Sequence, residues 1–190
     1  MNPYLPFRAK RLLLRPITPS DLPKVRELLN DPKLYGRRYI PKHDHPFPLT
    51  EVQLQEVFEE WSKGDKSQTF LVEEQTNGEL VGHTSFNWWW DPHQPFIDVV
   101  IYPLHQRKRY GTEVAVMVIN YLFRNSVAHN IGMAVADWNE GGRLFIESIG
   151  FQQAGVERRT GIRDGHYVDD LIYDILRPEW LARLNTEEGL

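Results

Sequence analysis

The sequence predicts a mixed α/β fold, with helices and strands that alternate along the chain. Three observations predict it. Some segments repeat apolar residues at helical spacing, others alternate them or run them continuously, and hairpin turns join several of the latter. No internal repeat and no Pro/Gly/Ser-rich linker divides these segments. We therefore expect one domain over residues 1–190, built on a mixed sheet.

The first 64 residues are predicted to form one strand and two helices. Clustered leucines indicate a strand over 10–17. The Thr-Pro-Ser-Asp sequence at 18–21 is typical of a helix start, with a Thr N-cap, a proline in the first position and an acid in the first turn. A second helix is expected from Thr50 to about Gly64, because Gln53 stands in the capping-box position. The proline-rich segment 32–49 between them is expected to be a loop.

The rest of the chain is predicted to alternate strands with two helices. The Asn-Gly pair within 76–79 indicates a hairpin turn, and a second turn is expected at Gly161–Gly165. The helices are expected at 111–123 and 141–148, the second one ending at Gly150. The predicted strands follow the period-2 or continuous apolar pattern: 69–74, 80–90, 96–102, 131–136, 151–158 and 168–176.

The composition excludes several classes of function. Of the 190 residues 41% are hydrophobic, and the formal net charge of −4 argues against a general nucleic-acid-binding protein. Without cysteine, the chain has no disulfide, no thiol nucleophile and no Cys-ligated metal site. The N-terminus lacks the apolar core of a secretory signal, and the longest apolar stretch, Ala115–Phe123, is too short to span a membrane. We expect a cytoplasmic protein with neither nucleic acid nor membrane as a partner.

The segment 101–113, IYPLHQRKRYGTE, carries the clearest chemical signal. A buried strand ends there, a short basic loop follows, and a helix opens at Gly111. A helix N-terminus has unpaired N–H groups and a partial positive charge, so this junction is suited to bind a phosphate or pyrophosphate. A basic surface turn is the alternative interpretation. The segment is neither a Walker A motif, since Gly-Lys-Ser/Thr is absent, nor a Rossmann fingerprint, since it has one glycine.

The sequence resembles the GNAT family of acyl-CoA-dependent N-acetyltransferases, and in particular its ribosomal-protein-acetylase-like (RimJ/RimL-type) branch. The opening R-L-x-L-R-P and T-x-x-D motifs of that branch match residues 11–21. Its central motif aligns without gaps on residues 101–111, and Thr112-Glu113 continues it. An Asn followed eleven residues later by Gly-Phe aligns on Asn139 and Gly150-Phe151. Three motifs in the correct order and spacing carry the resemblance.

The resemblance implies a mostly antiparallel, twisted sheet flanked by helices, with splayed strands that form an acyl-CoA cleft. Acetyl-CoA would be the co-substrate, and a primary amine, either a protein N-terminus or a small molecule, would attack its thioester directly. Main-chain groups near Ile101 would polarise the thioester, and Asn139 would bind the pantetheine arm. The implied cofactor-binding residues are Ile101, Gln106, Arg107, Lys108, Arg109, Tyr110, Gly111, Thr112 and Asn139.

Two positions depart from the family pattern. Arg109 replaces the first motif glycine, so we expect it to hold an ordinary φ unless the loop is differently placed. Its guanidinium either adds a phosphate contact or is a tolerated substitution in solvent. Ile146 stands where many members have a tyrosine that protonates the departing thiolate, so water would supply that proton. The missing tyrosine and glycine also leave open a non-catalytic module that binds acyl-CoA.

The general base is open between Asp98 and His83, on neighbouring predicted strands. Asp98 would need a strand bulge to face the substrate and is otherwise a structural carboxylate; His83 is otherwise a satisfied strand histidine. Trp88–Trp90 are interpreted as core and interface residues or as an aromatic wall for a cationic amine. The loop residues His43, His45 and His93 lack metal-ligand spacing, so we expect no metal. The aromatic content permits a homodimer.

Overall fold

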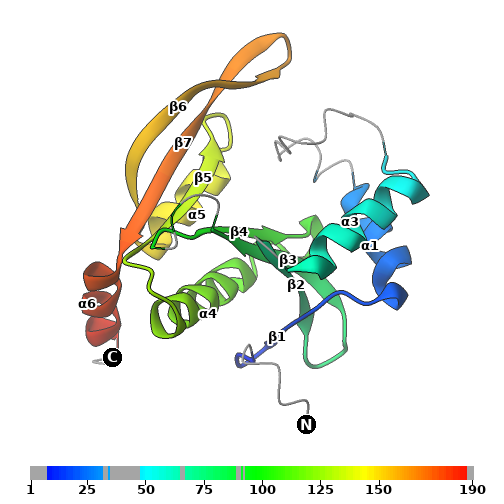
Figure 1. Ribbon diagram of the computed structural model, residues 1–190, viewed down its shortest axis with the longest axis horizontal. Helices are drawn as coiled ribbons and strands as arrows, with labels where there is room; N and C mark the ends of the chain where they lie inside the picture. Colours follow the sequence, from blue (N-terminus) through cyan, green and yellow to red (C-terminus); the bar gives the residue numbers. More distant parts are fainter. Residues whose placement is uncertain are drawn as a thin grey trace. The chain divides into compact units, whose positions relative to one another are not determined.

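The computed structural model describes residues 8–31, 34, 48–64, 67–88, 91 and 93–187 (Figure 1). Contacts divide the chain into two compact units, Met1–Phe86 with Val99–Val114 and Asn87–Asp98 with Ala115–Leu190. The elements in chain order are β1 (Leu12–Arg15), the 3-10 helix η1 (Pro19–Asp21), α1 (Leu22–Leu29), α3 (Glu51–Lys63), β2 (Ser67–Glu74), β3 (Leu80–Asn87), β4 (Phe96–Ile101), the 3-10 helix η2 (Pro103–His105), α4 (Tyr110–Asn125), β5 (Asn130–Ala136), α5 (Glu140–Ile149), β6 (Gln152–Arg163), β7 (His166–Leu176) and α6 (Arg177–Glu187).

The strands form a seven-stranded mixed sheet. The first unit contributes the order β1-β2-β3-β4 and the second the order β4-β5-β7-β6, because β4 runs through both. β1 and β2 pair antiparallel, as do β5 with β7 and β6 with β7, whereas β4 and β5 are parallel. The predicted mixed α/β fold is confirmed, while the single domain over 1–190 stays a prediction.

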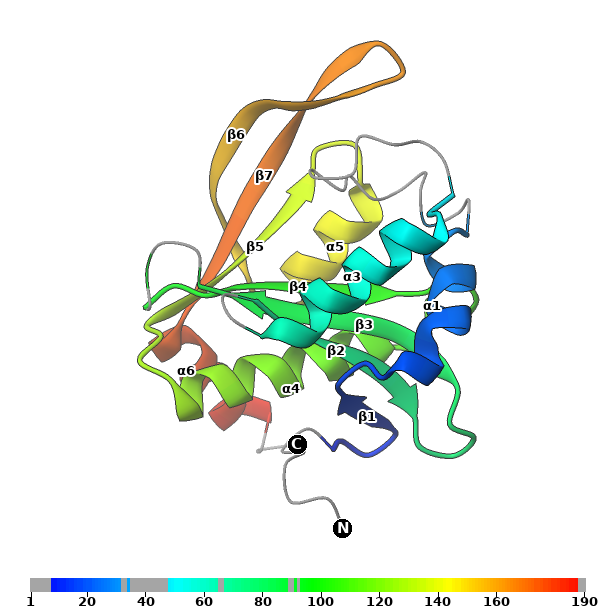
Figure 2. The ribbon, with the colours of Figure 1, turned by 45° about the vertical axis from the view of Figure 1, so that its right-hand side comes forward.

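The local signals in the first unit act as the sequence predicts. Thr50 caps α3 by accepting a hydrogen bond from the Gln53 N–H, and Gly64 ends the helix in the left-handed region. Gly78 has a φ of +72° in the turn between β2 and β3. α3 packs on β2 and beside α1 (Figure 2), and their apolar faces share one core. The described part of this unit is therefore a four-strand layer covered by two helices.

Close approach of β3 and β4 depends on Gly82. A Cβ at this position would lie 2.2 Å from the carbonyl oxygen of Val100, which is backbone and cannot move aside. The main chains are joined nearby, where the Tyr102 N–H donates to the Val81 carbonyl at 2.9 Å. Gly82 thus fixes how close β3 lies to the end of β4, from which the basic loop departs.

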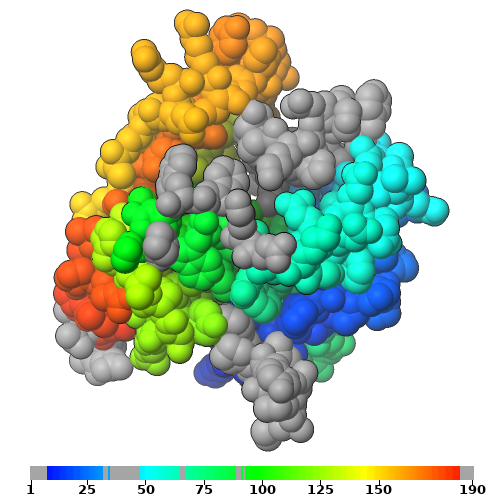
Figure 3. Space-filling view, in the orientation of Figure 1, coloured from blue at the N-terminus to red at the C-terminus, as the bar shows by residue number. Residues whose placement is uncertain are grey.

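The second unit is organised around β7. Its register with β5 runs from Asn130 opposite Leu176 to Ala136 opposite Asp170, and the β6–β7 hairpin continues past the end of β5. The hairpin tip is visible as the orange surface of Figure 3, where Ile162 and Tyr167 are exposed. The registered pairing of β4 with β5 is a single pair, Phe96 with Gly132.

The structure differs from the prediction at the end of one strand and by one additional helix. The strand expected over 80–90 ends at Asn87, and α6 is a helix that the sequence analysis does not predict. Trp180 anchors α6: its side chain is buried, and its indole N–H donates to Asn120 Oδ1 at 2.9 Å. His43, His45, Trp89 and Trp90, together with most of the predicted loop 32–49, lie outside the described residues. In the ranges given above, no helix is both long and apolar enough to cross a membrane.

Candidate functional site: the loop before helix α4

The basic loop between η2 and α4 has a backbone in which φ changes sign from residue to residue. Gln106 has a φ of −66°, Arg107 of +63° and Arg109 of +64°, and Lys108 between the arginines is not among the positive-φ residues. Left-handed conformation costs a residue with a Cβ about 1–2 kcal/mol. The expectation of an ordinary φ for Arg109 is therefore wrong. Its backbone holds the conformation for which the family uses glycine.

This backbone gives the loop the properties of an anion site. Alternation of right- and left-handed residues turns successive N–H groups toward one side, which forms a concave "nest" for an anion. α4 begins immediately after it at Tyr110, so the positive end of the helix dipole adds to the same field. The side chains of Arg107, Lys108 and Arg109 are exposed. The described loop therefore combines main-chain donors with three exposed cations.

Two of the predicted binding residues use their side chains to hold the loop. The Gln106 amide donates to the Ile101 carbonyl at 2.9 Å, which ties the loop to the end of β4. The buried Tyr110 hydroxyl donates to Glu74 Oε1 at 2.7 Å, and this hydrogen bond raises the pKa of Tyr110. The Gln106 N–H donates to the Pro103 carbonyl at 3.5 Å, so of these two residues Tyr110, at the start of α4, is the one whose main-chain N–H suits a ligand.

Two residues that support the loop were not predicted from the sequence. His105 is 6% exposed, and its Nε2 lies 3.5 Å from Glu79 Oε1. Arg11 forms a hydrogen bond with Lys108, lies over the ring of Tyr110 and forms an ion pair with Glu113. Arg11 stood in a matched motif but carried no signal of its own, because its partners lie about one hundred residues away along the chain.

The two candidate bases have different surroundings, and they belong to different units. His83 is 2% exposed; its Nδ1 lies 3.3 Å from the Tyr102 hydroxyl and its ring centroid 4.8 Å from that of Trp61. Asp98 is half-buried on β4, where the buried residues are Ile97 and Val100. Because those two are three positions apart, they lie on opposite faces of the strand, so β4 is buried on both faces, and this pattern is not the bulge that Asp98 would need to face the substrate.

Asn139 lies at the start of α5 and caps it. Its Oδ1 accepts a hydrogen bond from the Gly142 N–H at 3.0 Å. A Cβ on Gly142 would lie 2.7 Å from Asn139 Nδ2 and 2.8 Å from Val135 Cγ2, which explains the glycine at this position. Ile146, in the position of the family's tyrosine, is a core residue with 2% exposure. No acid is available at that position.

The remaining predicted residues do not belong to the loop before α4. His93 and Asp91 form an exposed pair with Nδ1 and Oδ1 2.9 Å apart, and the His93 N–H lowers the pKa of Asp91. Trp88 is half-buried. Within the described part of the chain, no three His, Asp or Glu side chains gather as a metal site would require, and the absence of a metal stays a prediction.

The chain matches a known protein family and several related proteins. The acetyltransferase (GNAT) domain model matches residues 11–152. An uncharacterised N-acetyltransferase of Bacillus subtilis, YnaD, is 28% identical over 90% of this chain and 96% of its own length. A GNAT acetyltransferase structure from Bacillus anthracis is 25% identical with a TM-score of 0.78, covering 91% of this chain and 99% of that one.

A further structure agrees in fold. Spermidine N-acetyltransferase from Vibrio cholerae, solved with CoA and spermine, has a TM-score of 0.77 at 21% identity, covering 91% of this chain and 99% of that one. The family-model match, residues 11–152, includes the strand–loop–helix junction described above. The chain belongs to the GNAT family of acyl-CoA-dependent N-acetyltransferases.

Proposed function

We propose that the protein transfers the acetyl group of acetyl-CoA to a primary amine, and that the loop 106–109 with the start of α4 binds the diphosphate of CoA. The alternating φ of Arg107 and Arg109 is the observation that carries this proposal. Left-handed conformation at two arginines separated by one residue is costly, and a bound anion offsets such a cost. The family match supports the diphosphate of CoA as that anion.

The proposed cofactor contacts are mostly main-chain groups. The N–H groups from Arg107 to Gly111 would bind the diphosphate, since that of Gln106 donates to the Pro103 carbonyl, and the exposed Thr112 lies in the first turn of the same helix. Arg107, Lys108 and Arg109 would supply the long-range attraction. Asn139, whose Oδ1 caps α5, remains a proposed contact to the pantetheine arm.

The Ile101 N–H is the proposed donor to the thioester carbonyl. Tyr102 directs its N–H to Val81 on β3, and successive residues of a strand direct their main-chain groups to opposite sides. The main-chain N–H and carbonyl of Ile101 therefore point away from β3. The carbonyl accepts a hydrogen bond from the Gln106 side chain. An N–H aimed at the oxygen that becomes negative in the transition state stabilises it electrostatically.

The chemistry is a direct displacement. The amine nitrogen attacks the thioester carbon, the C–S bond breaks, and the amine loses one proton. Asp98 and His83 are the proposed acceptors of that proton, and exposure favours Asp98, which is half-buried whereas His83 is 2% exposed. The thiolate takes its proton from water, because a thiol with a pKa of about 8.5 is a good leaving group without an acid.

The acceptor is proposed to be a weakly basic amine. Deprotonating a lysine or a polyamine at pH 7 costs about 4.6 kcal/mol, whereas an α-amine costs about 1 kcal/mol. A site without an evident strong base suits the second, and the RimJ/RimL-type motifs at residues 11–21 point to a protein N-terminus. A small-molecule amine is the alternative, and the Vibrio cholerae relative acts on spermidine.

Thiol release from acetyl-CoA, measured against a panel of N-terminal peptides, polyamines and aminoglycosides, tests the proposed reaction. We expect turnover with at least one peptide amine and weaker turnover with polyamines. Binding of CoA without turnover on any amine would instead support the non-catalytic acyl-CoA-binding module.

Arg109→Gly separates the backbone role of this position from its side-chain role. Glycine relieves the left-handed strain, so the free energy of unfolding should rise by about 0.5–1 kcal/mol. Loss of the guanidinium should raise KM for acetyl-CoA about threefold at low salt, through one lost charge-assisted contact. Urea unfolding and initial rates measure the two effects.

Arg159→Gly is the matched control, because Arg159 has a φ of +56° on β6. It should gain similar stability without a change in KM. A KM of the Arg109 variant that is unchanged and independent of salt would mean that the side chain lies in solvent.

A further inference from the structure

Arg11, just before β1, contacts three residues of the loop and the helix that follows it. Its main-chain N–H and its Nε donate to the two carboxylate oxygens of Glu113, at 3.0 and 2.8 Å. Its Nη1 donates to the Lys108 carbonyl at 3.1 Å, and its Cζ lies 4.7 Å from the centroid of the Tyr110 ring. One side chain thus holds the loop at the residue between its two left-handed arginines.

Glu113 presents an electrostatic difficulty for an anion site. It lies in the first turn of α4, where a carboxylate suits the helix dipole but repels a diphosphate bound at the same end. Its side chain is 17% exposed, so water screens the charge only in part. Because Arg11 donates to both of its oxygens, the carboxylate is directed away from solvent and neutralised.

We propose that Arg11 is a positioning residue for the cofactor, which holds loop 106–109 in its nest conformation and cancels the charge of Glu113. This rests on the proposed function, in which that loop binds the diphosphate. Two kinds of contact carry the inference: the hydrogen bond to Lys108 fixes the backbone, and the paired hydrogen bonds to Glu113 remove a repulsive charge. Loss of Arg11 should therefore weaken the cofactor more than it slows the chemical step.

Titration calorimetry with CoA, combined with steady-state rates, tests this inference on the full-length protein. Arg11→Ala should raise the Kd for CoA about tenfold and KM for acetyl-CoA similarly, the range expected for lost charge-assisted hydrogen bonds. At saturating acetyl-CoA, kcat should change less than twofold. Arg26→Ala, which removes an exposed ion pair with Glu51 between α1 and α3, is the control and should leave Kd within twofold.

Variants of Glu113 distinguish neutralisation from a merely structural anchor. Glu113→Gln should bind CoA at least as tightly as the wild type, and in the Arg11→Ala background it should restore at least half of the lost affinity on a logarithmic scale. A structural anchor predicts weaker binding by Glu113→Gln and no recovery in the double variant. If Arg11→Ala does not fold, Glu113→Gln alone decides, because a structural anchor predicts a higher Kd for CoA and neutralisation predicts a Kd no higher than that of the wild type.

The inference is overturned if Arg11→Ala binds CoA within twofold of the wild type, or if the double variant binds no more tightly than Arg11→Ala. A wild-type protein that does not bind CoA at all would instead overturn the proposed function. Titration of the wild type therefore tests the proposed function, and titration of the variants tests the role of Arg11.

Discussion

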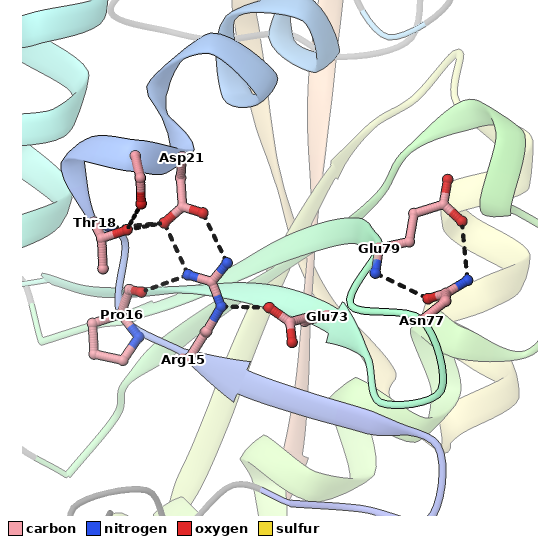
Figure 4. Close-up of polar contacts among 8 residues, drawn as sticks. Arg15, Pro16, Thr18, Asp21, Glu73, Asn77 and Glu79 are labelled. Atoms are coloured by element: carbon pink, nitrogen blue, oxygen red, sulfur yellow. Dashed lines mark hydrogen bonds and ion pairs between the residues drawn. The ribbon is translucent and has the colours of Figure 1, made fainter.

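Replacing Asp21 with alanine is expected to lower the free energy of unfolding by about 2–3 kcal/mol, because the substitution leaves the largely buried Arg15 guanidinium without its main partner. Asp21 accepts two hydrogen bonds from Arg15, at 2.8 and 2.9 Å, and two from the N–H and hydroxyl of Thr18, at 2.8 and 2.7 Å (Figure 4). Arg15 also donates to Glu73 on β2 at 2.6 Å. The network ties the start of the first helical segment to β1 and β2.

The same network predicts a pH dependence. The Arg15 hydrogen bonds, and then those of Thr18, lower the pKa of Asp21 from 3.8 to about 2. A carboxyl group whose folded pKa lies below its unfolded value stabilises the fold above the unfolded pKa. The contribution is therefore complete above about pH 4 and is lost as the pH falls toward 2. The stability difference between the wild type and Asp21→Ala should shrink over that range.

Urea unfolding at pH 7 and at pH 2.5 measures both effects. Glu27→Ala is the matched control, since its ion pair with Lys24 is exposed on α1, and it should cost less than about 0.5 kcal/mol at either pH. A loss below about 1 kcal/mol for Asp21→Ala at pH 7, or a loss that does not depend on pH, would contradict the structural role of this network.

Asp98→Asn is expected to lower kcat/KM for the amine about 100-fold, the lower end of what a general base contributes. The half-buried carboxylate lies on β4 three residues before Ile101, the proposed thioester donor. The amide is of similar size but cannot take a proton. The ascending limb of the pH–rate profile should therefore change in this variant.

His83→Gln is the comparison for that experiment. His83 is enclosed beside Trp61 and Tyr102, so its replacement should reduce stability and leave the ascending limb in place. The reverse outcome, an unchanged limb for Asp98→Asn and a lost limb for His83→Gln, would assign the base to His83. An unchanged limb in both would indicate that the amine loses its proton to water.

Much of the fold could be predicted because its signals are local. The Thr50 capping box, the Asn-Gly turn before β3 and the helix end at Gly150 each depend on neighbours within a few residues, and each is confirmed. The mixed sheet followed from the same reasoning, since period-2 segments joined by hairpins and helices leave few arrangements. The GNAT fold itself, implied by motifs in the correct order, is confirmed by the family match.

What could not be predicted depends on contacts distant in sequence. The left-handed φ of Arg109 contradicts local preference and is held in part by Arg11, 98 residues earlier. α6 had a local signal that the sequence analysis did not use: Pro178 lies at its start, and Glu179 accepts a hydrogen bond from the Leu176 N–H at 2.9 Å. β7 ends directly before these residues, so the change from a strand period to a helix period is abrupt and was not recognised.

Isothermal titration of the purified protein with CoA, set beside titration with pantetheine, which lacks the diphosphate, tests the central claim most directly. We expect saturable binding of one CoA per chain that weakens as salt is raised, and little binding of pantetheine alone, because the diphosphate would contact the nest at Arg107 and Arg109. Equal binding of CoA and pantetheine, or no heat with either, would contradict the assignment of this loop as the cofactor site.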